Sequence, residues 1–213
     1  MTSLILQQIE LSIAGQPLLG PLDLTVPPGQ IAAVMGPSGA GKSSLLSYIC
    51  GVLPKSIAAR GCILLGNLEI TPLPPEQRRL GILFQDDMLF PHLSVAGNLA
   101  FGLPRAKRSR KERARLIAEA LDSFGLAGFA DRDPATLSGG QRARVALLRT
   151  ILSQPRALLL DEPFAHLDPD TRNTVRRLVV EEIERRALPA LLVTHDEEDA
   201  RLVDGPLIRL PMR

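Results

Sequence analysis

The most regular feature of the chain is a set of short runs in which almost every residue is apolar. Residues 31–35, 80–84, 157–160 and 190–194 form such runs, and glycine or polar residues follow each of them. A strand of a parallel sheet is covered on both faces, so its sequence lacks the alternation of a half-exposed strand. The four runs therefore predict a buried, mostly parallel sheet, and residues 207–210 predict one last short strand.

The N-terminal segment has a different pattern, in which apolar and polar residues partly alternate. Residues 4–11 form the first such stretch, a turn is expected at Ala14–Pro17, and a second strand lies near residues 22–26. Residues 61–65, followed by Gly66-Asn67, predict a further strand that ends in a turn. Short strands of this kind indicate an antiparallel β layer beside the parallel sheet.

Helical periodicity dominates the middle of the chain. Apolar residues between 110 and 124 recur with the spacing of a helix face, and Gly125 suits the position just after the helix end. Ser94 is a candidate cap of another helix, and Asp168-Pro169 is expected to begin a helix that runs toward Arg186. Helices between buried strands predict an α/β fold.

Length and composition agree with one α/β domain that carries an insertion. The chain has 213 residues, and 45% of them are hydrophobic, which is enough for a packed core. We expect one domain over residues 1–213. Its core would consist of residues 1–85 and 156–213, and residues 86–155 would form an inserted helical subdomain.

Charge, cysteines and hydropathy restrict the possible partners. The formal net charge is +2, so bulk charge argues neither for nor against nucleic acid; no nucleic-acid partner is expected. Cys50 and Cys62 lack metal-ligand spacing and are predicted to be buried thiols. No signal-peptide pattern is evident, and no apolar run approaches the roughly 18 residues that cross a bilayer, so another chain would span any membrane.

Basic residues crowd one segment near the expected start of the helix at 110–124. We interpret them as a solvated helix face rather than as a lipid or nucleic-acid patch, because no aromatic residue interleaves them. The residues are Arg105, Lys107, Arg108, Arg110, Lys111, Arg113 and Arg115.

The strongest chemical signal directly follows the first apolar run. Residues 36–43 read Gly-Pro-Ser-Gly-Ala-Gly-Lys-Ser and precede a helix-like segment at 44–50, which is the context that a phosphate-binding P-loop requires. The loop N–H groups and the helix dipole would hold phosphates. Lys42 would reach the β- and γ-phosphates, and the Ser43 hydroxyl would ligate Mg²⁺. The expected ATP-binding residues are Gly36, Pro37, Ser38, Gly39, Ala40, Gly41, Lys42, Ser43 and Ser44.

Polar residues stand at the ends of the other apolar runs. They are Gln85, Asp161-Glu162 and His195, and ligands of parallel α/β sheets bind at the carboxyl ends of the strands. Asp161 is expected to contact Mg²⁺ directly or through a water that the metal holds, and Glu162 to act as the general base that deprotonates the attacking water. Gln85 would contact Mg²⁺ or that water, and His195 would donate to the γ-phosphate. The predicted core is therefore that of a P-loop NTPase, with Ser43, Gln85 and Asp161 near the metal.

A second glycine-rich stretch, Leu137–Gln141, precedes another helix. Ser138 and Gln141 fit a capping box, but Gly139 and Gly140 are costly in the first turn of a helix that is only structural. Their bare backbone would form a second anion site. Two phosphate-binding loops with a single P-loop strand indicate a head-to-tail homodimer, in which each nucleotide lies between the P-loop of one copy and Ser138–Gln141 of the other.

Taken together and in this order, these motifs resemble those of the ATP-binding subunits of ABC transporters over essentially the whole chain. The resemblance rests on the Walker A run 36–43, the Q-loop Gln85, the signature 137–141, the Walker B acids Asp161-Glu162, the D-loop 165–168 ending at Asp168, and the switch His195. It implies an ATPase with Mg²⁺ as cofactor, bound peripherally at the cytoplasmic face of the inner membrane, where its dimer closes around two Mg-ATP.

The segment after Gln85 narrows the resemblance. Residues 83–103 look like those of bacterial importer ATPases for thiamine, sulfate, molybdate, iron or polyamines. That likeness implies that residues just after Gln85 receive the coupling helices of a transmembrane permease. It also implies a secreted solute-binding protein in the same system.

Two features depart from the family pattern, and three alternative functions stay open. Ile13 stands where the family usually has an aromatic residue that stacks on adenine, and the chain ends soon after His195, so no regulatory C-terminal domain is expected. An exporter ATPase would share every motif. A soluble ABC ATPase of ribosomes or DNA usually carries two cassettes or a long coiled-coil insertion, and a P-loop kinase of metabolites needs no signature.

Overall fold

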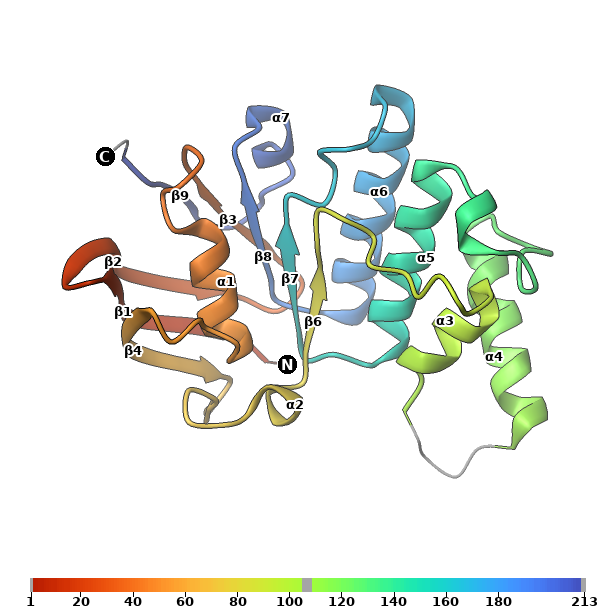
Figure 1. Ribbon diagram of the computed structural model, residues 1–213, viewed down its shortest axis with the longest axis horizontal. Coiled ribbons are helices and arrows are strands. Elements are labelled where there is room, and N and C mark those ends of the chain that lie inside the picture. The colour runs from red at the N-terminus through yellow and green to blue at the C-terminus, as the bar shows by residue number, and fades with distance from the viewer. Residues whose placement is uncertain (1, 105–108, 212–213) are drawn as a thin grey trace. The chain divides into compact units, whose positions relative to one another are not determined.

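The structure is a computed structural model that describes residues 2–104 and 109–211 (Figure 1). The chain groups into two compact units. The first unit contains residues 1–82, 156–162 and 180–213, and the second contains residues 83–155 and 163–179. The expected assignment of one domain, with a core and an insertion bounded at residues 85 and 156, stays a prediction.

The first unit contains the antiparallel layer that the N-terminal pattern predicts. This sheet has the strand order β2-β1-β4-β5, and β1 pairs antiparallel with both β2 and β4. Ala14 and Gly15 form the β1–β2 turn, with φ of 49° and 78°, because a two-residue turn of this hand requires positive φ at both positions. The strands are β1 (Leu4–Ile13), β2 (Gln16–Val26), β4 (Ile57–Leu65) and β5 (Leu68–Glu69).

β2 begins earlier than the sequence predicts, at Gln16 instead of residue 22. Two prolines, Pro17 and Pro21, disguise its first half in the sequence. β2 lies at the edge of its sheet, where one side of the strand has no partner and proline is therefore tolerated.

The apolar runs form the second sheet, and parallel pairing joins β3 to β8, β3 to β9 and β7 to β8. Every residue of β3 and β8 is buried, which explains their continuous apolar sequences. Because β3, β7 and β8 are parallel, their carboxyl ends lie at one edge, where Gly36, Glu162 and His195 follow. The strand order is β6 (Leu80–Leu83), β7 (Ala157–Asp161), β8 (Ala190–Thr194), β3 (Ile31–Met35) and β9 (Leu207–Arg209).

Helices α1 (Lys42–Cys50), α2 (Pro75–Arg78) and α7 (Glu197–Ala200) belong to the first unit. The patterns did not predict α2 and α7, because helices of four residues are too short to show a period. α6 (Pro169–Arg186) continues from the second unit into the first. Together with the two sheets, these helices confirm the predicted α/β fold of the P-loop NTPase type.

Side-chain caps begin the helices of the second unit. Ser94 caps its helix as predicted, Ser109, Asp133 and Ser138 cap the others, and Gly125 follows its helix at φ 65° as predicted. These helices are α3 (Val95–Gly102), α4 (Arg110–Ser123), the 3₁₀ turn η1 (Pro134–Thr136) and α5 (Gly139–Leu152).

The structure bears on two expectations about side chains, the burial of the cysteines and the exposure of the basic residues near the start of α4. Cys50 and Cys62 are half-buried and not buried, so the predicted burial was wrong; partial burial still raises the pKa of Cys50 to about 11. Among the basic residues, Arg105, Lys107 and Arg108 lie outside the described residues. Arg110, Lys111 and Arg115 are exposed on α4, as a solvated face requires, and Arg115 pairs with Glu119 at 3.1 Å.

No helix within residues 2–104 and 109–211 combines the length and the apolar character that a bilayer crossing demands.

Candidate nucleotide-binding and hydrolysis site

The P-loop connects β3 to α1 and is closed around its own lysine. Gly39 and Gly41 have φ of 84° and 88°, which glycine adopts without the steric cost of a side chain. Lys42 is buried, and its Nζ donates to the carbonyls of Gly36 at 2.7 Å and Pro37 at 3.0 Å. Gly41 caps α1 with no side-chain hydrogen bond. The first N–H groups of α1 therefore lack a capping side chain, and an anion can accept from them.

The far end of α1 is held by a residue that the sequence did not indicate. Arg78 is buried, and its guanidinium donates to the carbonyls of Tyr48 and Ile49 at the last turn of α1, at 2.8 and 2.7 Å. A cation at a helix C-terminus neutralises the negative end of the dipole. The one sequence signal is Gly51, where a Cβ would lie 2.8 Å from the Arg78 guanidinium.

Ser43 and Asp161 come together as predicted for a metal site. Ser43 Oγ lies 3.4 Å from Oδ1 of Asp161. Burial raises the pKa of Asp161, and the neighbouring charge of Glu162 raises it further, so a cation would be favourable here. One hydroxyl and one carboxylate are hard oxygen ligands, and Mg²⁺ in NTPases typically takes one or two such groups with phosphates and water. The described residues contain no cluster of three acidic, histidine or cysteine side chains that could hold a metal alone.

Glu162 lies between a cation and an imidazole. Its Oε1 is 3.8 Å from Nζ of Lys42, and its Oε2 is 2.9 Å from Nδ1 of His195. The backbone of Glu162 has φ 47°, a left-handed conformation that costs a non-glycine residue about 1–3 kcal/mol. Its N–H nevertheless donates to the carbonyl of Val193 at 3.0 Å. Strain of this kind is concentrated at functional sites, and no sequence pattern predicts it.

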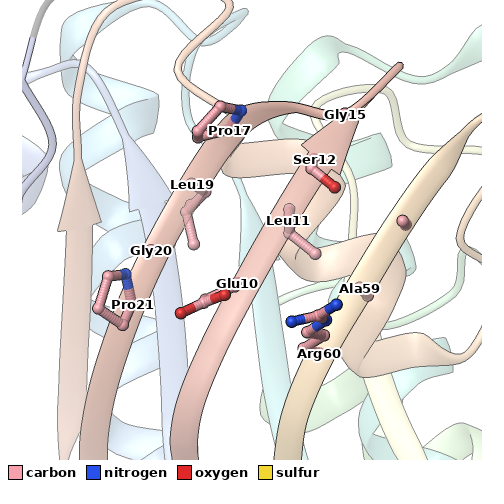
Figure 2. Close-up of a pocket in the computed structure, with 11 residues that line it drawn as sticks. Glu10, Leu11, Ser12, Gly15, Pro17, Leu19, Gly20, Pro21, Ala59 and Arg60 are labelled. Atoms are coloured by element: carbon pink, nitrogen blue, oxygen red, sulfur yellow. The ribbon is translucent and has the colours of Figure 1, made fainter.

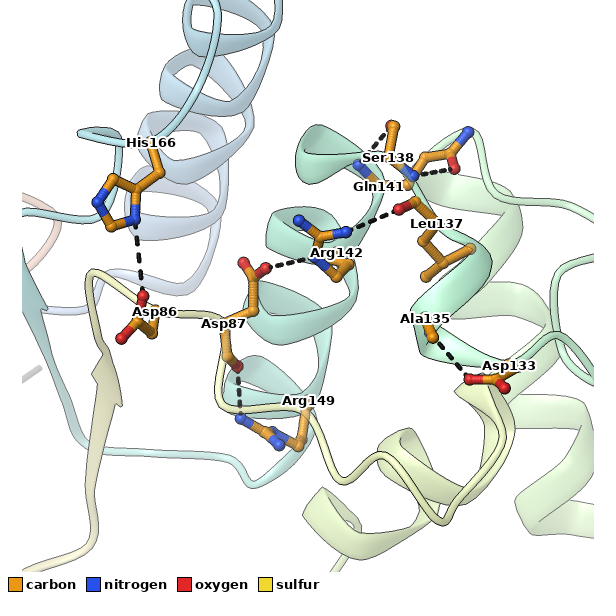
Figure 3. Close-up of polar contacts among 10 residues, drawn as sticks. All are labelled: Asp86, Asp87, Asp133, Ala135, Leu137, Ser138, Gln141, Arg142, Arg149 and His166. Atoms are coloured by element: carbon orange, nitrogen blue, oxygen red, sulfur yellow. Dashed lines mark hydrogen bonds and ion pairs between the residues drawn. The ribbon is translucent and has the colours of Figure 1, made fainter.

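Gln85 belongs to the second unit, where its nearest polar partner is the D-loop. Nε2 of Gln85 lies 3.2 Å from Nε2 of His166, and Nδ1 of His166 lies 3.6 Å from Asp86 Oδ1 (Figure 3). The contact of Gln85 with Mg²⁺ or water stays a prediction. The sequence places His166 in the D-loop but indicates no role for it.

The predicted capping box is present at the start of α5 (Figure 3). Gln141 N donates to Ser138 Oγ at 3.3 Å, and Ser138 N donates to Gln141 Oε1 at 2.9 Å. We call Leu137–Gln141 the signature loop. Ser138 is exposed, so an anion can approach this helix start.

The two glycines of the signature loop have different reasons to lack a side chain. A Cβ on Gly140 would lie 2.0 Å from Cγ2 of Thr171, so Gly140 is required by the packing of α5 against the start of α6. A Cβ on Gly139 would meet no atom closer than 3.9 Å. Gly140 thus has a packing reason to lack a side chain, whereas Gly139 has open space around it; that both glycines serve an anion stays a prediction.

Asp168 caps α6 as the sequence predicts. Its Oδ1 accepts from Thr171 N at 3.1 Å, and hydrogen bonding to Thr171 lowers the pKa of Asp168. Thr171 thus links two motifs of the second unit, since the same residue packs against Gly140.

A groove of about 490 Å³ lies in the antiparallel sheet (Figure 2). Leu19 lines the groove and also lies close to the P-loop, since a side-chain Cβ at Gly41 would be 3.4 Å from Cβ of Leu19. Glu10, Ser12 and Arg60 line it too, and none of its lining residues is aromatic. The groove is therefore adjacent to the phosphate loop but offers no ring for a base.

Comparisons with known proteins find relatives over most of the chain. A family model described as ABC transporter matches residues 19–165. The chain is 45% identical over 196 residues to the uncharacterized ABC transporter ATP-binding protein YnjD of Escherichia coli (strain K12), covering 92% of this chain and 90% of YnjD. It is 42% identical over 179 residues to the Fe(3+) ions import ATP-binding protein FbpC 2 of Rhizobium meliloti (strain 1021), covering 84% of this chain and 45% of FbpC 2. The chain thus spans less than half the length of that import relative.

One solved structure covers nearly the whole fold. The ATP-binding cassette MJ0796, in a dimeric post-hydrolysis state bound to ADP and Pi, matches with a TM-score of 0.81 and 29% identity, covering 97% of this chain and 94% of that chain.

Proposed function

Because this chain belongs to the ABC transporter family and is an ATPase of that family, we propose that two copies close head-to-tail around two Mg-ATP and power the import of a small solute. The observation that carries this proposal is the pair of separate phosphate-binding starts in one chain. The first is the P-loop before α1, and the second is the exposed capped start of α5 at Ser138 and Gly139.

Residues of the first unit carry the chemistry in this proposal. The loop N–H groups and Lys42 bind the phosphates, and Ser43 with Asp161 holds Mg²⁺, which would offset the charge that develops on the phosphates. Glu162 takes a proton from the attacking water as the general base. His195 orients the Glu162 carboxylate through Nδ1.

Residues of the second unit complete each site across the dimer. Ser138 and Gly139 bind the γ-phosphate of the partner's nucleotide from their helix start. Gln85 contacts Mg²⁺ or the attacking water, and Asp168 holds the D-loop at the start of α6. Closure over ATP and opening after hydrolysis would convert the chemical step into movement of the two copies.

Exposed apolar side chains of the second unit suggest where a permease binds. Met88 is 60% exposed and Phe101 is 68% exposed, and Phe101 packs edge-on against Phe90 with ring centroids 4.6 Å apart. Asn98 is fully buried and fixes this loop, since its amide bonds the N–H and carbonyl of Phe90 at 2.8 and 3.1 Å. Apolar groups presented on a fixed backbone are typical of a protein interface.

The import direction rests on resemblance, because FbpC 2 is named as an import protein and residues 83–103 resemble importer ATPases. In this proposal the chain acts at the cytoplasmic face of the inner membrane, beside permease subunits and with a secreted solute-binding protein. Adjacent reading frames that encode a multi-span permease and a secreted binding protein would support import. A permease frame without a binding protein would favour an exporter.

Light scattering tests the dimer directly. The Glu162→Gln chain at micromolar concentration should be monomeric without nucleotide and double its molar mass with Mg-ATP, because binding is retained while hydrolysis is stopped. A molar mass that stays at 23.1 kDa at saturating Mg-ATP would contradict the shared-site proposal. The Lys42→Ala variant serves as the control and should stay monomeric.

A further inference from the structure

We propose that Arg142 is a positioning residue that ties the segment after Gln85 to the signature loop, and so sets how Ser138 and Gly139 meet a nucleotide. This inference rests on the proposed function, because it assumes that the signature loop binds ATP held by a partner copy. Every contact that carries it lies within the second unit.

Arg142 bonds in two directions from the end of the first turn of α5 (Figure 3). Its Nε donates to Oδ2 of Asp87 at 3.0 Å, and its Nη1 donates to the carbonyl of Leu137 at 2.8 Å. Leu137 immediately precedes Ser138, so one guanidinium touches both the Q-loop segment and the backbone that leads into the anion site. A shift of Asp87 therefore acts on the signature loop through a single side chain.

A second arginine holds the same segment along α5. Arg149, about two helical turns after Arg142, donates Nη1 to the carbonyl of Met88 at 2.7 Å and Nη2 to that of Asp87 at 3.1 Å. The segment is thus attached to one helix at two levels. A force on the exposed side chain of Met88 must move α5 with it or break an arginine contact.

The two-way contact explains why an arginine stands here. A guanidinium carries five donors in a rigid fork, whereas a lysine ammonium is one point charge on a flexible stem. Lysine at position 142 can reach Asp87 or Leu137 but cannot reproduce both bonds in this geometry. Arg142→Lys therefore keeps the charge and breaks the link.

The opposite side of the signature loop is fixed by shape. Gly140 packs on Thr171, and a Cβ there would lie 2.0 Å from Cγ2 of Thr171. That contact has no alternative arrangement short of separating α5 from α6. The hydrogen bonds of Arg142 can break and form again, so they can change the position of the signature loop.

The same unit contains a matched ion pair that touches no motif. Arg115 and Glu119 on α4 lie 3.1 Å apart, with side chains 66% and 57% exposed, whereas the Asp87 side chain is 27% exposed. Exposed pairs of this kind contribute about 0–1 kcal/mol. Arg115→Lys with Glu119→Gln is therefore the control for loss of an Arg–carboxylate pair.

The test measures ATP-dependent dimer formation by light scattering with the full chain, in the Glu162→Gln background. Asp87→Asn and Arg142→Lys should each raise the ATP concentration for half-maximal dimer about tenfold. The double variant should equal the worse single variant, because both changes act on the same link, Asp87→Asn by removing its charge and Arg142→Lys by removing its fork of donors. The affinity of each monomer for ADP, measured by calorimetry, should stay within twofold of the parent, since the P-loop is unchanged. The control pair should behave as the parent.

Each other outcome overturns the inference or the function on which it rests. A roughly hundredfold effect in the double variant would mean that the two residues act independently, and parent-like dimers in both singles would mean that the loop needs no Arg142. If ADP affinity or the melting temperature falls as well, the contact of Arg142 with Asp87 serves only to stabilise the fold. If Arg142→Lys does not fold, Asp87→Asn, which keeps the side-chain shape, gives the same readout. If the Glu162→Gln parent itself forms no dimer with ATP, that result contradicts the proposed function and says nothing against the contact of Arg142 with Asp87.

Discussion

Nδ1 of His195 lies 2.9 Å from Oε2 of Glu162, where the neighbouring strands β7 and β8 end. A carboxylate only accepts hydrogen bonds, so the proton of this contact is on Nδ1 of the imidazole. The other oxygen of Glu162 is 3.8 Å from Nζ of Lys42. The carboxylate is thus held from both sides, and this fixes its orientation as the proposed role of general base requires.

Glu162→Gln should reduce ATP turnover by a factor of about 10²–10⁴, which is the range for loss of a general base. The dissociation constant for ATP should be unchanged or lower, because a negative charge beside the triphosphate is removed. Steady-state phosphate release and calorimetry measure the two quantities. Retention of more than about a tenth of the parental turnover would exclude Glu162 as the base.

Ser138→Arg should block ATP-driven dimer formation and leave the fold intact. Ser138 is exposed, so its loss removes one helix cap, worth about 1 kcal/mol, whereas the larger side chain would collide with the nucleotide of the partner. Thermal unfolding of the monomer checks the first expectation, and light scattering checks the second.

Mixing the Ser138→Arg chain with a Lys42→Ala chain tests the shared site more sharply. A mixed dimer pairs the intact P-loop of the first chain with the intact signature loop of the second, so one sound site remains. ATP-dependent pairing should therefore reappear in the mixture, as seen by pull-down with a tag on one chain. If no pairing occurs in the mixture, the sites are not shared between copies.

Asp161→Asn should stabilise the nucleotide-free, metal-free subunit while it impairs Mg-ATP hydrolysis. Burial raises the pKa of Asp161, and the charge of Glu162 raises it further. A raised pKa in the folded state means that the fold gains from protonation, and this gain is lost as pH rises through the folded pKa. At neutral pH the charge is therefore a cost. Removing it should add about 0.5–1 kcal/mol.

Melting curves in EDTA measure this effect. A gain of that size raises the midpoint by about 1–4 °C for a chain of this length, and the difference from the parent should shrink below about pH 4, where Asp161 is protonated in both states. Glu119→Gln, on exposed α4, is the control and should show no such gain. A lower midpoint for Asp161→Asn at neutral pH would show that the charge is compensated in the free subunit.

The sequence predicts those parts of the site that depend on local order along the chain. The bounds of β3 and β8 are as expected, because strands buried on both faces are apolar throughout. The contact of Ser43 with Asp161, and the approach of Glu162 to His195, follow from parallel strands that end at one edge. Ser94, Asp168 and the capping box at Ser138 act on N–H groups three residues away, so spacing alone identifies them.

Contacts between distant segments were not predictable in the same way. Arg78 and Arg142 each bind main-chain carbonyls, and a carbonyl is present at every residue, so no sequence pattern marks the partner. The sequence explains Gly140 only through the start of its own helix, whereas the structure shows that Gly140 also packs against Thr171 of α6. The surrounding structure imposes the positive φ of Glu162, and a glutamate in the sequence gives no sign of that conformation.

Ile13→Tyr should tighten ATP binding, and GTP binding with it. Ile13 ends β1 with 43% of its surface exposed, and the adjacent groove has no aromatic lining residue. The residues proposed to bind nucleotide address phosphates and Mg²⁺, which all nucleoside triphosphates share. Stacking on a new ring is worth roughly 1–3 kcal/mol per base in nucleic-acid binders and tolerates any base. Both dissociation constants should thus fall about tenfold, and Ile13→Leu, which adds no ring, should change neither.

The parent chain should for the same reason bind ATP and GTP within about tenfold of each other, a difference of 1.4 kcal/mol. An aliphatic side chain at position 13 would bury part of the base but would form no hydrogen bond with the exocyclic amine of adenine. Arg60 lines the groove and carries a planar cation (Figure 2), which stacks on purines without distinguishing them strongly. Calorimetry of the isolated subunit with each nucleotide decides the question. A hundredfold preference for ATP would show that a polar group reads the adenine edge, which the apolar side chain of Ile13 cannot do.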